Sequence, residues 1–360
     1  MTTIISFREF FSAHKWKIML AVLLFLALIA GVTAYDATLA PSVETGDQNG
    51  KRAVYVPTGA NESNLDSLLR PYVKHGMFLR EIIDYCSEKY GGVKSGKFTI
   101  TDGMSNYDLM KRLFTLLHGE EVRVRFNATS DIESIAGTVA RQIEADSISL
   151  MQTFTDSLFL DSMQLDRNTL RAFFIPNTYN FYWDTSAGEF LSRMVAEYRA
   201  FWTPERLEKA SSIGMTPVEV STLASIVQAE TAKTDERADV AGLYVNRLKR
   251  GIRLQSDPTV IYAMRHEKGV EGPIRRVYLS DLKIKSPYNT YINKGLPPSP
   301  INIPDISAID AVLNHTPHNY IYMCASVERF GYHEFAEKLS EHNKNRRKYV
   351  KWVNDNGIKR

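Results

Sequence analysis

TPVEVSTLASIVQAET, residues 216–231, is the stretch from which the rest of the fold can be worked out. Thr216 suits the N-cap position of a helix, Pro217 suits the first helical position, and Glu219 completes a capping-box pattern. Apolar residues then recur on one helical face, at Val220, Leu223, Ala224 and Val227. Continuing that series by three residues reaches Glu230. The sequence therefore predicts a capped helix that carries a carboxyl group on its inward side.

An inward carboxyl group at Glu230 has two interpretations. Burial without a cationic partner raises the pKa of a carboxyl group, so that it keeps its proton near neutral pH. That protonated form is what a general acid needs, and glycosidic cleavage requires an acid to protonate the departing sugar oxygen. The alternative is a structural glutamate at a helix end, paired with Arg237 or Arg247.

The segments after this helix alternate helical patterns with turns. A second helix is predicted over 235–250, with Gly251 as its stop. Ser256-Asp257-Pro258 resembles an N-cap followed by proline in the first turn, which predicts a short helix through Met264. The loops SPYNTY (286–291) and GLPPSP (295–300) come next.

Near the start of the chain, residues 18–35 form an uncharged apolar run, IMLAVLLFLALIAGVTAY. About 18 residues at about 1.5 Å each reach about 27 Å, close to the roughly 30 Å hydrocarbon core of a bilayer. Basic residues precede the run and acidic residues follow it: Arg8, Lys15 and Lys17 before it, Asp36, Glu44 and Asp47 after it. This asymmetry predicts a single-pass membrane anchor, with residues 1–17 in the cytoplasm.

A cleaved signal peptide is the alternative to an anchor, because Val32-Thr33-Ala34 resembles a cleavage site of small residues. The length of the run, and Trp16 and Tyr35 at its two ends, favour an uncleaved transmembrane helix. The rest of the chain is then exported.

Beyond the anchor, the pattern predicts an α+β protein in three parts. Residues 36–51 lack apolar periodicity and predict an extended tether. Residues 52–120 follow the order strand, helix, helix, strand, which is compatible with a LysM-like carbohydrate-binding subdomain or with a plain structural domain. Residues 121–360 predict a mainly helical domain with short strands. Its aromatic segment 173–183, FFIPNTYNFYW, is either the floor of a sugar site or a buried hairpin.

The composition bears on which ligands and partners the chain can bind. The 44 basic residues nearly balance the 41 acidic ones, for a net charge of +3, so nothing favours nucleic acid. Cys86 and Cys324 fit no metal-ligand spacing, and we interpret them as unpaired buried thiols, although an oxidising compartment would allow them to pair. The pair His315 and His318, and His333, have no convincing further ligand with which to complete a metal site. We expect neither a metal nor a cofactor.

Longer segments resemble a known family. Several segments of the second half resemble the endolytic murein transglycosylases of the YceG-like family. They are LASIVQAETAKTDERADVAGLYVNRLKRGIRLQSDPTVIYAM (223–264), SPYNTY, GLPPSPI (295–301) and GYHEFAEKLSEHN (331–343). FTITDGMSNYDLMKRL (98–113) and IPNTYNF (175–181) also match the layout of that family.

The resemblance implies a bitopic inner-membrane protein with a LysM-like subdomain and a catalytic domain related to lytic transglycosylases. It implies that Glu230, in the pair Glu230-Thr231, is the catalytic acid and base. A neighbouring position that is often acidic in the family is Gln228 here. Two further departures are Ile303-Pro304-Asp305 and Tyr322-Met323-Cys324, which we expect to affect packing near the cleft but no catalytic residue.

By the same resemblance we expect a set of substrate-binding residues, each of which is equally compatible with fixing a loop. They are Thr231, Gln255, Tyr288, Asn289, Thr290 and Tyr291. The implied reaction cuts the bond between N-acetylmuramic acid and N-acetylglucosamine in nascent glycan strands and leaves 1,6-anhydromuramic ends. The implied partners are peptidoglycan glycan strands, the membrane and peptidoglycan synthases.

Two other functions stay open. A muramidase would use water as the nucleophile and a second carboxylate, for which Asp257 is the best candidate, although we favour an N-cap role for Asp257. A non-enzymatic, membrane-tethered scaffold that binds peptidoglycan is the other alternative.

Overall fold

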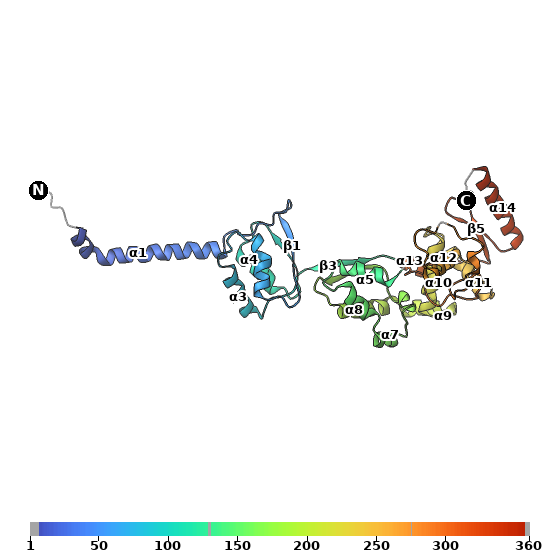
Figure 1. Ribbon diagram of the computed structural model, residues 1–360, viewed down its shortest axis with the longest axis horizontal. Helices are drawn as coiled ribbons and strands as arrows, with labels where there is room; N and C mark the ends of the chain where they lie inside the picture. The colour runs from blue at the N-terminus through green and yellow to red at the C-terminus, as the bar shows by residue number, and fades with distance from the viewer. Residues whose placement is uncertain (1–6, 129–130, 275, 357–360) are drawn as a thin grey trace. The chain divides into compact units, whose positions relative to one another are not determined.

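The computed structural model describes residues 7–128, 131–274 and 276–356, with side chains from residue 15 onward (Figure 1). Residues 1–6 of the predicted cytoplasmic segment and the Arg8 side chain lie outside this description. The described residues form mostly helices and three two-stranded sheets, which agrees with a helix-rich α+β class. The chain divides into two compact units: unit 1 comprises Met1–Arg123 and Asn180–Thr185, and unit 2 comprises Val124–Tyr179 and Ser186–Arg360.

The apolar run lies within a single helix, α1 (Phe7–Thr38). Its segment Lys15–Thr38 is long and apolar enough to cross a bilayer, and its side chains are exposed. A helix that exposes apolar side chains all round is typical of a membrane span rather than of a surface helix of a soluble protein. The helix is therefore compatible with a single-pass anchor.

The predicted tether at 36–51 is wrong, because α1 extends into it and the residues that follow fold onto unit 1. The backbone N–H of Val43 donates to Met104 O at 2.9 Å, and Val43 is buried. The Asn106 side-chain amide donates to Ala37 O at 2.8 Å. These contacts come from residues about 60 positions away, which is why local composition gave no sign of them.

Unit 1 has the predicted order of strand, helix, helix and strand. Its elements are β1 (Lys51–Val56), α2 (Glu62–Leu69), η1 (Arg70–Tyr72), α3 (Leu79–Tyr90), β2 (Gly96–Thr101) and α4 (Asn106–Thr115). Strand β1 pairs antiparallel with β2, with Val54 opposite Phe98, and both side chains are buried against the helices. Gly96 has φ 127°, and a Cβ there would lie 2.1 Å from His118 O, so this close approach requires glycine.

The region from β3 to α9 buries most rings of the aromatic segment 173–183, although Tyr182 stays exposed. Its elements are β3 (Glu121–Phe126), α5 (Ile132–Ala140), α6 (Ser147–Phe154), α7 (Ser157–Met163), η2 (Thr169–Ala172), β4 (Asn177–Tyr182), α8 (Ala187–Phe201) and α9 (Pro204–Ser212). Strands β3 and β4 pair, and the unit boundary crosses this sheet. Phe174 is buried and its ring centroid lies 4.9 Å from that of Phe154 and 6.3 Å from that of Phe126. The packing role is therefore confirmed for the buried rings, but the predicted hairpin is wrong, because β4 pairs with the distant strand β3.

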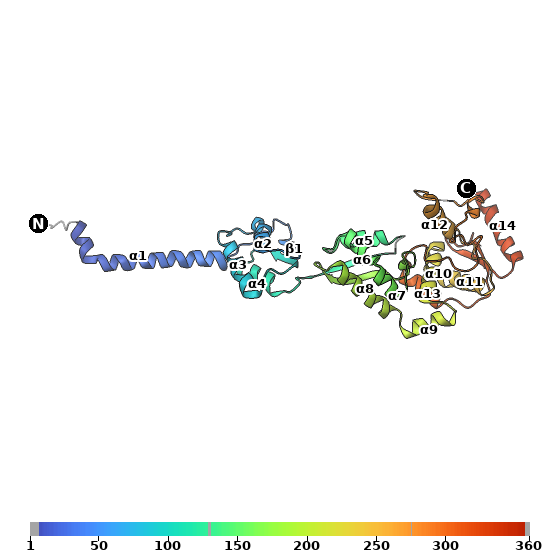
Figure 2. The ribbon, with the colours of Figure 1, turned by 60° about the horizontal axis from the view of Figure 1, so that its bottom comes forward.

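The second part of unit 2 is built around α10 (Pro217–Glu230), as Figure 2 shows. The other elements of this part are α11 (Arg237–Lys249), α12 (Asp257–Lys268), η3 (Asp281–Lys283), α13 (Ile306–Leu313), β5 (Tyr322–Ala325), β6 (His333–Ala336) and α14 (Leu339–Asp355). Of these, α11, α12 and α13 pack on α10. The predicted capping box of α10 is confirmed, since Thr216 and Glu219 each accept from the backbone N–H of the other. Its four predicted apolar positions are fully buried against neighbouring helices.

Helix α12 is longer than predicted. It runs to Lys268, and Gly269 ends it in a left-handed conformation at φ 61°. The last turn, residues 265–268, is exposed and mostly charged. Because an exposed turn lacks apolar periodicity, the pattern ended at Met264 although the helix continues.

Candidate active site

A pocket of about 340 Å³ opens within unit 2 at the C-terminal end of α10. Its walls come from helices α10, α11 and α12, strands β5 and β6, the first turn of α14 and the SPYNTY loop. The polar side chains that line it are Glu230, Tyr244, Arg247, Gln255, Asp257, Tyr291, Tyr322, His333 and His342. Glu230 therefore stands in a concave site.

Glu230 is held by hydroxyl groups rather than by a cation. The Tyr244 hydroxyl donates to Glu230 Oε2 at 3.1 Å, and the Ser256 hydroxyl donates to the same oxygen at 3.0 Å. Both donors are themselves buried, Tyr244 in α11 and Ser256 just before α12.

The two arginines proposed to neutralise Glu230 have other partners. Arg237 binds Asp305, with Nη1 at 2.8 Å from Oδ1. Arg247 donates to Gln255 Oε1 at 2.5 Å and to backbone carbonyls. The structural interpretation of Glu230 as an ion-paired helix end is therefore wrong.

This environment raises the pKa of Glu230. Burial is the main cause, because it penalises the charged form. The hydrogen bond from Ser256, the positive charge of His333 and the hydrogen bond from Tyr244 act in the opposite direction, while the negative charge of Asp257 adds to the rise. The balance lets Glu230 keep its proton to a higher pH than an ordinary glutamate does, and the protonated form is the one that can donate.

Ser256 occupies the N-cap position of α12, yet its side chain makes no cap hydrogen bond and contacts Glu230 instead. The N-cap role expected for Asp257 is wrong, since Asp257 is the first residue of the helix. Its Oδ1 accepts a hydrogen bond of 2.6 Å from the Tyr291 hydroxyl. A second carboxylate therefore lines the pocket with Glu230.

Of the predicted substrate-binding residues, Gln255 and Tyr291 line the pocket with Glu230. Gln255 has φ 53°, a left-handed conformation that is uncommon for a residue with a side chain, and Arg247 holds its amide oxygen. Burial, together with the hydrogen bond and negative charge of Asp257, raises the pKa of Tyr291. The Tyr291 phenol is thus a neutral hydrogen-bonding group at any pH near neutrality.

The structure turns the other four predicted side chains away from the pocket. Thr231 Oγ1 accepts from the Lys233 backbone, and the Tyr288 hydroxyl lies 2.7 Å from Ser299 Oγ. The Asn289 amide donates to the carbonyls of Leu282 and Ile284, each at 2.9 Å, and Thr290 Oγ1 accepts from Ser256 N at 3.0 Å. These side chains fix the loops that present Ser256 and Tyr291.

His333 and Glu236 form a buried pair beside Glu230 that sequence reasoning missed. His333 Nδ1 lies 3.0 Å from Glu236 Oε2, and the His333 backbone N–H donates to Glu236 Oε1 at 2.5 Å. Burial alone would lower the pKa of His333, but the hydrogen bond and charge of Glu236, with the charge of Glu230, raise it overall. The imidazole therefore keeps its proton to a higher pH than an ordinary histidine does.

Tyr244 and Arg247 also escaped prediction, although one signal pointed to them. Both follow Val240 at helical spacing on the buried face of α11. A tyrosine and an arginine on such a face need buried partners, and here the partners are Glu230 and Gln255.

The departures from the family pattern have structural roles. Gln228 Oε1 accepts from the Asp305 backbone at 2.7 Å, and Asp305 caps α13 and pairs with Arg237. Tyr322-Met323-Cys324 forms most of β5 and lines the pocket, so this departure changes the wall that faces Glu230.

The remaining polar candidates have ordinary roles. His318 Nε2 lies 2.9 Å from Asp239 O, and His315 bonds a helix carbonyl. Cys86 and Cys324 are unpaired, the first buried and the second half-buried. Among the described residues, no cluster of three or more His, Cys, Asp or Glu side chains is arranged to hold a metal ion.

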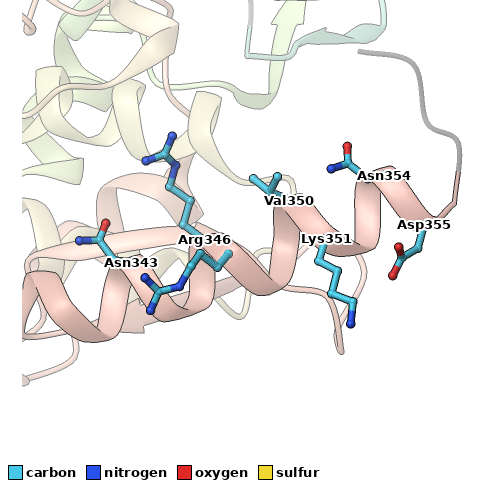
Figure 3. A pocket seen from close by; sticks show the side chains of 7 residues that line it. Asn343, Arg346, Val350, Lys351, Asn354 and Asp355 are labelled. Carbon is cyan, nitrogen blue, oxygen red and sulfur yellow. The ribbon is translucent and has the colours of Figure 1, made fainter.

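Helix α14 carries a basic stretch that faces solvent. Its lysines and arginines at 344, 346, 347, 348 and 351 are exposed. Figure 3 shows a hollow along this helix, with Arg346, Val350 and Lys351 on its wall. Within the described part of the chain, this hollow shares no lining residue with the pocket of Glu230.

Comparison with known proteins gives a consistent result. The model of the YceG-like family matches residues 54–348. A Bacillus subtilis protein named endolytic murein transglycosylase is 26% identical over 347 residues, covering 91% of this chain and 92% of that protein. A Streptococcus pneumoniae (strain D39) protein of the same name is 28% identical over 374 residues, and the match spans 94% of this chain but 66% of that longer protein.

A solved structure supports the same assignment. A yceG-like protein from Listeria monocytogenes superposes with a TM-score of 0.52 and 25% identity, covering 82% of this chain and 98% of that chain. Since the family model spans most of the residues on which the two-unit fold and the Glu230 pocket are built, this chain belongs to the YceG-like family.

Proposed function

We propose that this chain is a membrane-anchored endolytic peptidoglycan transglycosylase in which Glu230 is the only catalytic acid and base. The observation that carries the proposal is a carboxyl group that lines a pocket, is held on one oxygen by two hydroxyl groups and forms no ion pair with any described residue, while burial raises its pKa. The relatives named endolytic murein transglycosylase supply the substrate class.

The reaction needs one group that first gives a proton and then takes one back. Glu230 protonates the oxygen between C1 of N-acetylmuramic acid and N-acetylglucosamine, and the C1–O bond breaks. The resulting carboxylate accepts the proton of the muramic C6 hydroxyl as O6 bonds to C1. The products are a 1,6-anhydromuramic end and a free N-acetylglucosamine hydroxyl, with no water consumed.

The neighbours of Glu230 stabilise the carboxylate that exists between the two proton transfers. Tyr244 and Ser256 donate hydrogen bonds to it, and hydrogen bonds to a charged acceptor are stronger than those to a neutral one. The imidazolium of His333, kept cationic by Glu236, adds a positive charge in the same pocket. Gln255 and Tyr291 supply polar contacts for the sugar from two neighbouring loops.

A second candidate function rests on Asp257. Its carboxylate lines the same pocket as Glu230, so a hydrolytic muramidase with two carboxyl groups has the side chains that it needs. We favour the transglycosylase because the Tyr291 hydroxyl already donates to Asp257 Oδ1 at 2.6 Å, so that oxygen is occupied by a protein donor.

The cellular setting follows from α1 and the substrate. An anchor in the cytoplasmic (inner) membrane with its N-terminus inside puts both units on the side where glycan strands are made. There the enzyme terminates nascent strands next to peptidoglycan synthases. Unit 1, whose element order is that of a LysM-like module, stands between the anchor and the catalytic unit in the chain.

Mass spectrometry of glycan strands digested by the purified full chain tests the reaction. The transglycosylase predicts fragments with anhydromuramic ends, lighter by one water than hydrolytic fragments. Reducing muramic ends would instead support the muramidase, and intact strands would support a non-enzymatic scaffold.

A further inference from the structure

Unit 1 has a pocket of its own, of about 380 Å³, between α3 and α4 and beside the end of α1. Three tyrosines line it while keeping large parts of their rings in solvent: Tyr85 is 63% exposed, Tyr107 56% and Tyr90 40%. Thr38, the last residue of α1, forms part of its rim. A cluster of exposed aromatic side chains around a hollow indicates a surface that binds another protein, a ligand or a membrane.

The depth of this pocket relative to a bilayer can be derived from α1. The uncharged run ends at Tyr35, and Thr38 lies three residues further, about 4.5 Å along the helix axis at about 1.5 Å per residue. The headgroup layer on each side of the hydrocarbon core is about 5–8 Å thick. The bond from Asn106 to Ala37 O ties the start of α4 to this level. The pocket therefore begins inside the headgroup layer, without an intervening spacer.

The side chains match that layer. Tyrosine rings are enriched where hydrocarbon meets headgroups, because one edge is apolar and the hydroxyl is polar. The Lys89 ammonium lies 5.8 Å from the Tyr85 ring centroid and 5.3 Å from that of Tyr90. Lys111 and Glu81 line the same pocket, so two cations and one carboxyl group surround an apolar floor. A long apolar stem with a charged end is suited to reach a phosphate.

We propose that this pocket holds a glycerophospholipid of the leaflet that surrounds the outer end of α1. The glycerol and upper acyl chain lie against the apolar floor, and the phosphate lies beside Lys89 and Lys111. Unit 1 then rests on the membrane through α3 and α4. The proposal depends on α1 being the membrane anchor, and it is independent of the chemistry at Glu230. A glycan occupant fits less well, because a sugar needs many hydrogen-bonding partners where this floor is apolar.

The test uses the full chain in phospholipid nanodiscs that contain a phospholipid with a photoactivatable diazirine close to its glycerol. After irradiation, mass spectrometry identifies the labelled peptides. We expect labels on α1 and on the segments of α3 and α4 that contain Tyr85 and Tyr107. The double substitution Tyr85→Ser/Tyr107→Ser should lower labelling of α3 and α4 by about tenfold and leave that of α1 unchanged. Both side chains are exposed, so the variant should keep its thermal unfolding temperature.

A control variant and a competition experiment distinguish a lipid pocket from a nonspecific apolar surface or a sugar site. Tyr278→Ser removes an equally exposed aromatic side chain from unit 2 and should change nothing. Labels on α1 alone would overturn the lipid pocket and leave the anchor standing, whereas absence of label from α1 as well would overturn both. Loss of the α3 and α4 labels when soluble glycan strands are added would also overturn the proposal, because it would identify the occupant as a sugar.

Discussion

Ser256 stands at the N-cap of α12 but donates its hydroxyl to Glu230 at 3.0 Å, so one side chain has exchanged a structural hydrogen bond for one in the pocket. An N-cap bond stabilises a protein by about 0.5–2 kcal/mol. Forgoing that contribution makes sense if the bond to Glu230 serves the reaction.

Ser256→Ala should lower kcat by about tenfold, since a hydrogen bond to a charged group is worth about 1.5–3 kcal/mol and part of that is regained by water. The bond lowers the pKa of Glu230, so its loss should move the alkaline limb of the kcat/KM profile to higher pH. Exposed Ser212, at the end of α9, offers a matched Ser212→Ala control with an unchanged profile. An unaltered pH profile for Ser256→Ala would show that Ser256 does not influence the pKa of Glu230.

His333→Gln should also move the alkaline limb upward. The groups that face Glu230 are Tyr244 and Arg247 from α11, Ser256 and Asp257 at α12, Tyr291, His342 and His333. Removing the cation at 333 raises the pKa of Glu230, and activity that requires the protonated acid then persists to higher pH before it declines. The measurement is kcat/KM against pH.

The same substitution leaves Glu236 buried without its imidazole partner, which should also reduce stability. A second, conservative substitution is Glu236→Gln, which removes the negative charge that raises the pKa of His333. It should also move the alkaline limb of the kcat/KM profile to higher pH. His75→Gln, an exposed histidine of unit 1, is the matched control. A downward shift in either pocket variant would contradict the assigned charges.

Asp257→Asn should keep activity within about tenfold, because the proposed reaction uses one carboxyl group. Removing the negative charge lowers the pKa of Glu230, so the alkaline limb should move to lower pH, opposite to the other variants. Product ends should stay anhydromuramic. A loss about as large as that for Glu230 substitution would favour the muramidase.

Gly242→Ala should destabilise unit 2 by about 1–3 kcal/mol through overpacking. A Cβ there would lie 2.5 Å from Thr316 O and 2.8 Å from His318 Nε2, so the loop that packs on α11 must move. Gly188→Ala in α8 is the control: a Cβ meets nothing within 4 Å, and alanine should stabilise the helix by up to about 1 kcal/mol. Denaturant unfolding of both variants measures the difference, and equal midpoints would refute the packing argument.

Helix α10 could be predicted in full because its determinants are local. Thr216, Pro217 and Glu219 fix its start, and its buried face repeats within the helix itself. The apolar run of α1 has the same property. Both elements carry their physical cause in adjacent residues.

The pocket could be predicted only in part because its contacts are distant. His333 and Glu236 are 97 positions apart, and nothing in either local sequence indicates the pairing. Tyr288 and Tyr291 share one loop, yet only Tyr291 lines the pocket, since an irregular loop has no period from which side-chain direction follows. The folding of residues 36–51 onto unit 1 escaped prediction for the same reason.

The most direct measurement compares kcat/KM of the full chain with that of Glu230→Gln on glycan strands. Glutamine keeps the size of the side chain and an acceptor for Tyr244 and Ser256 but has no proton to transfer. General acid–base catalysis contributes about 10²–10⁴-fold, and one group performs both proton transfers here, so we predict a loss of about 10³-fold or more with an unchanged unfolding temperature. A folded Glu230→Gln variant that cleaves strands within tenfold of the unmodified protein would contradict the account.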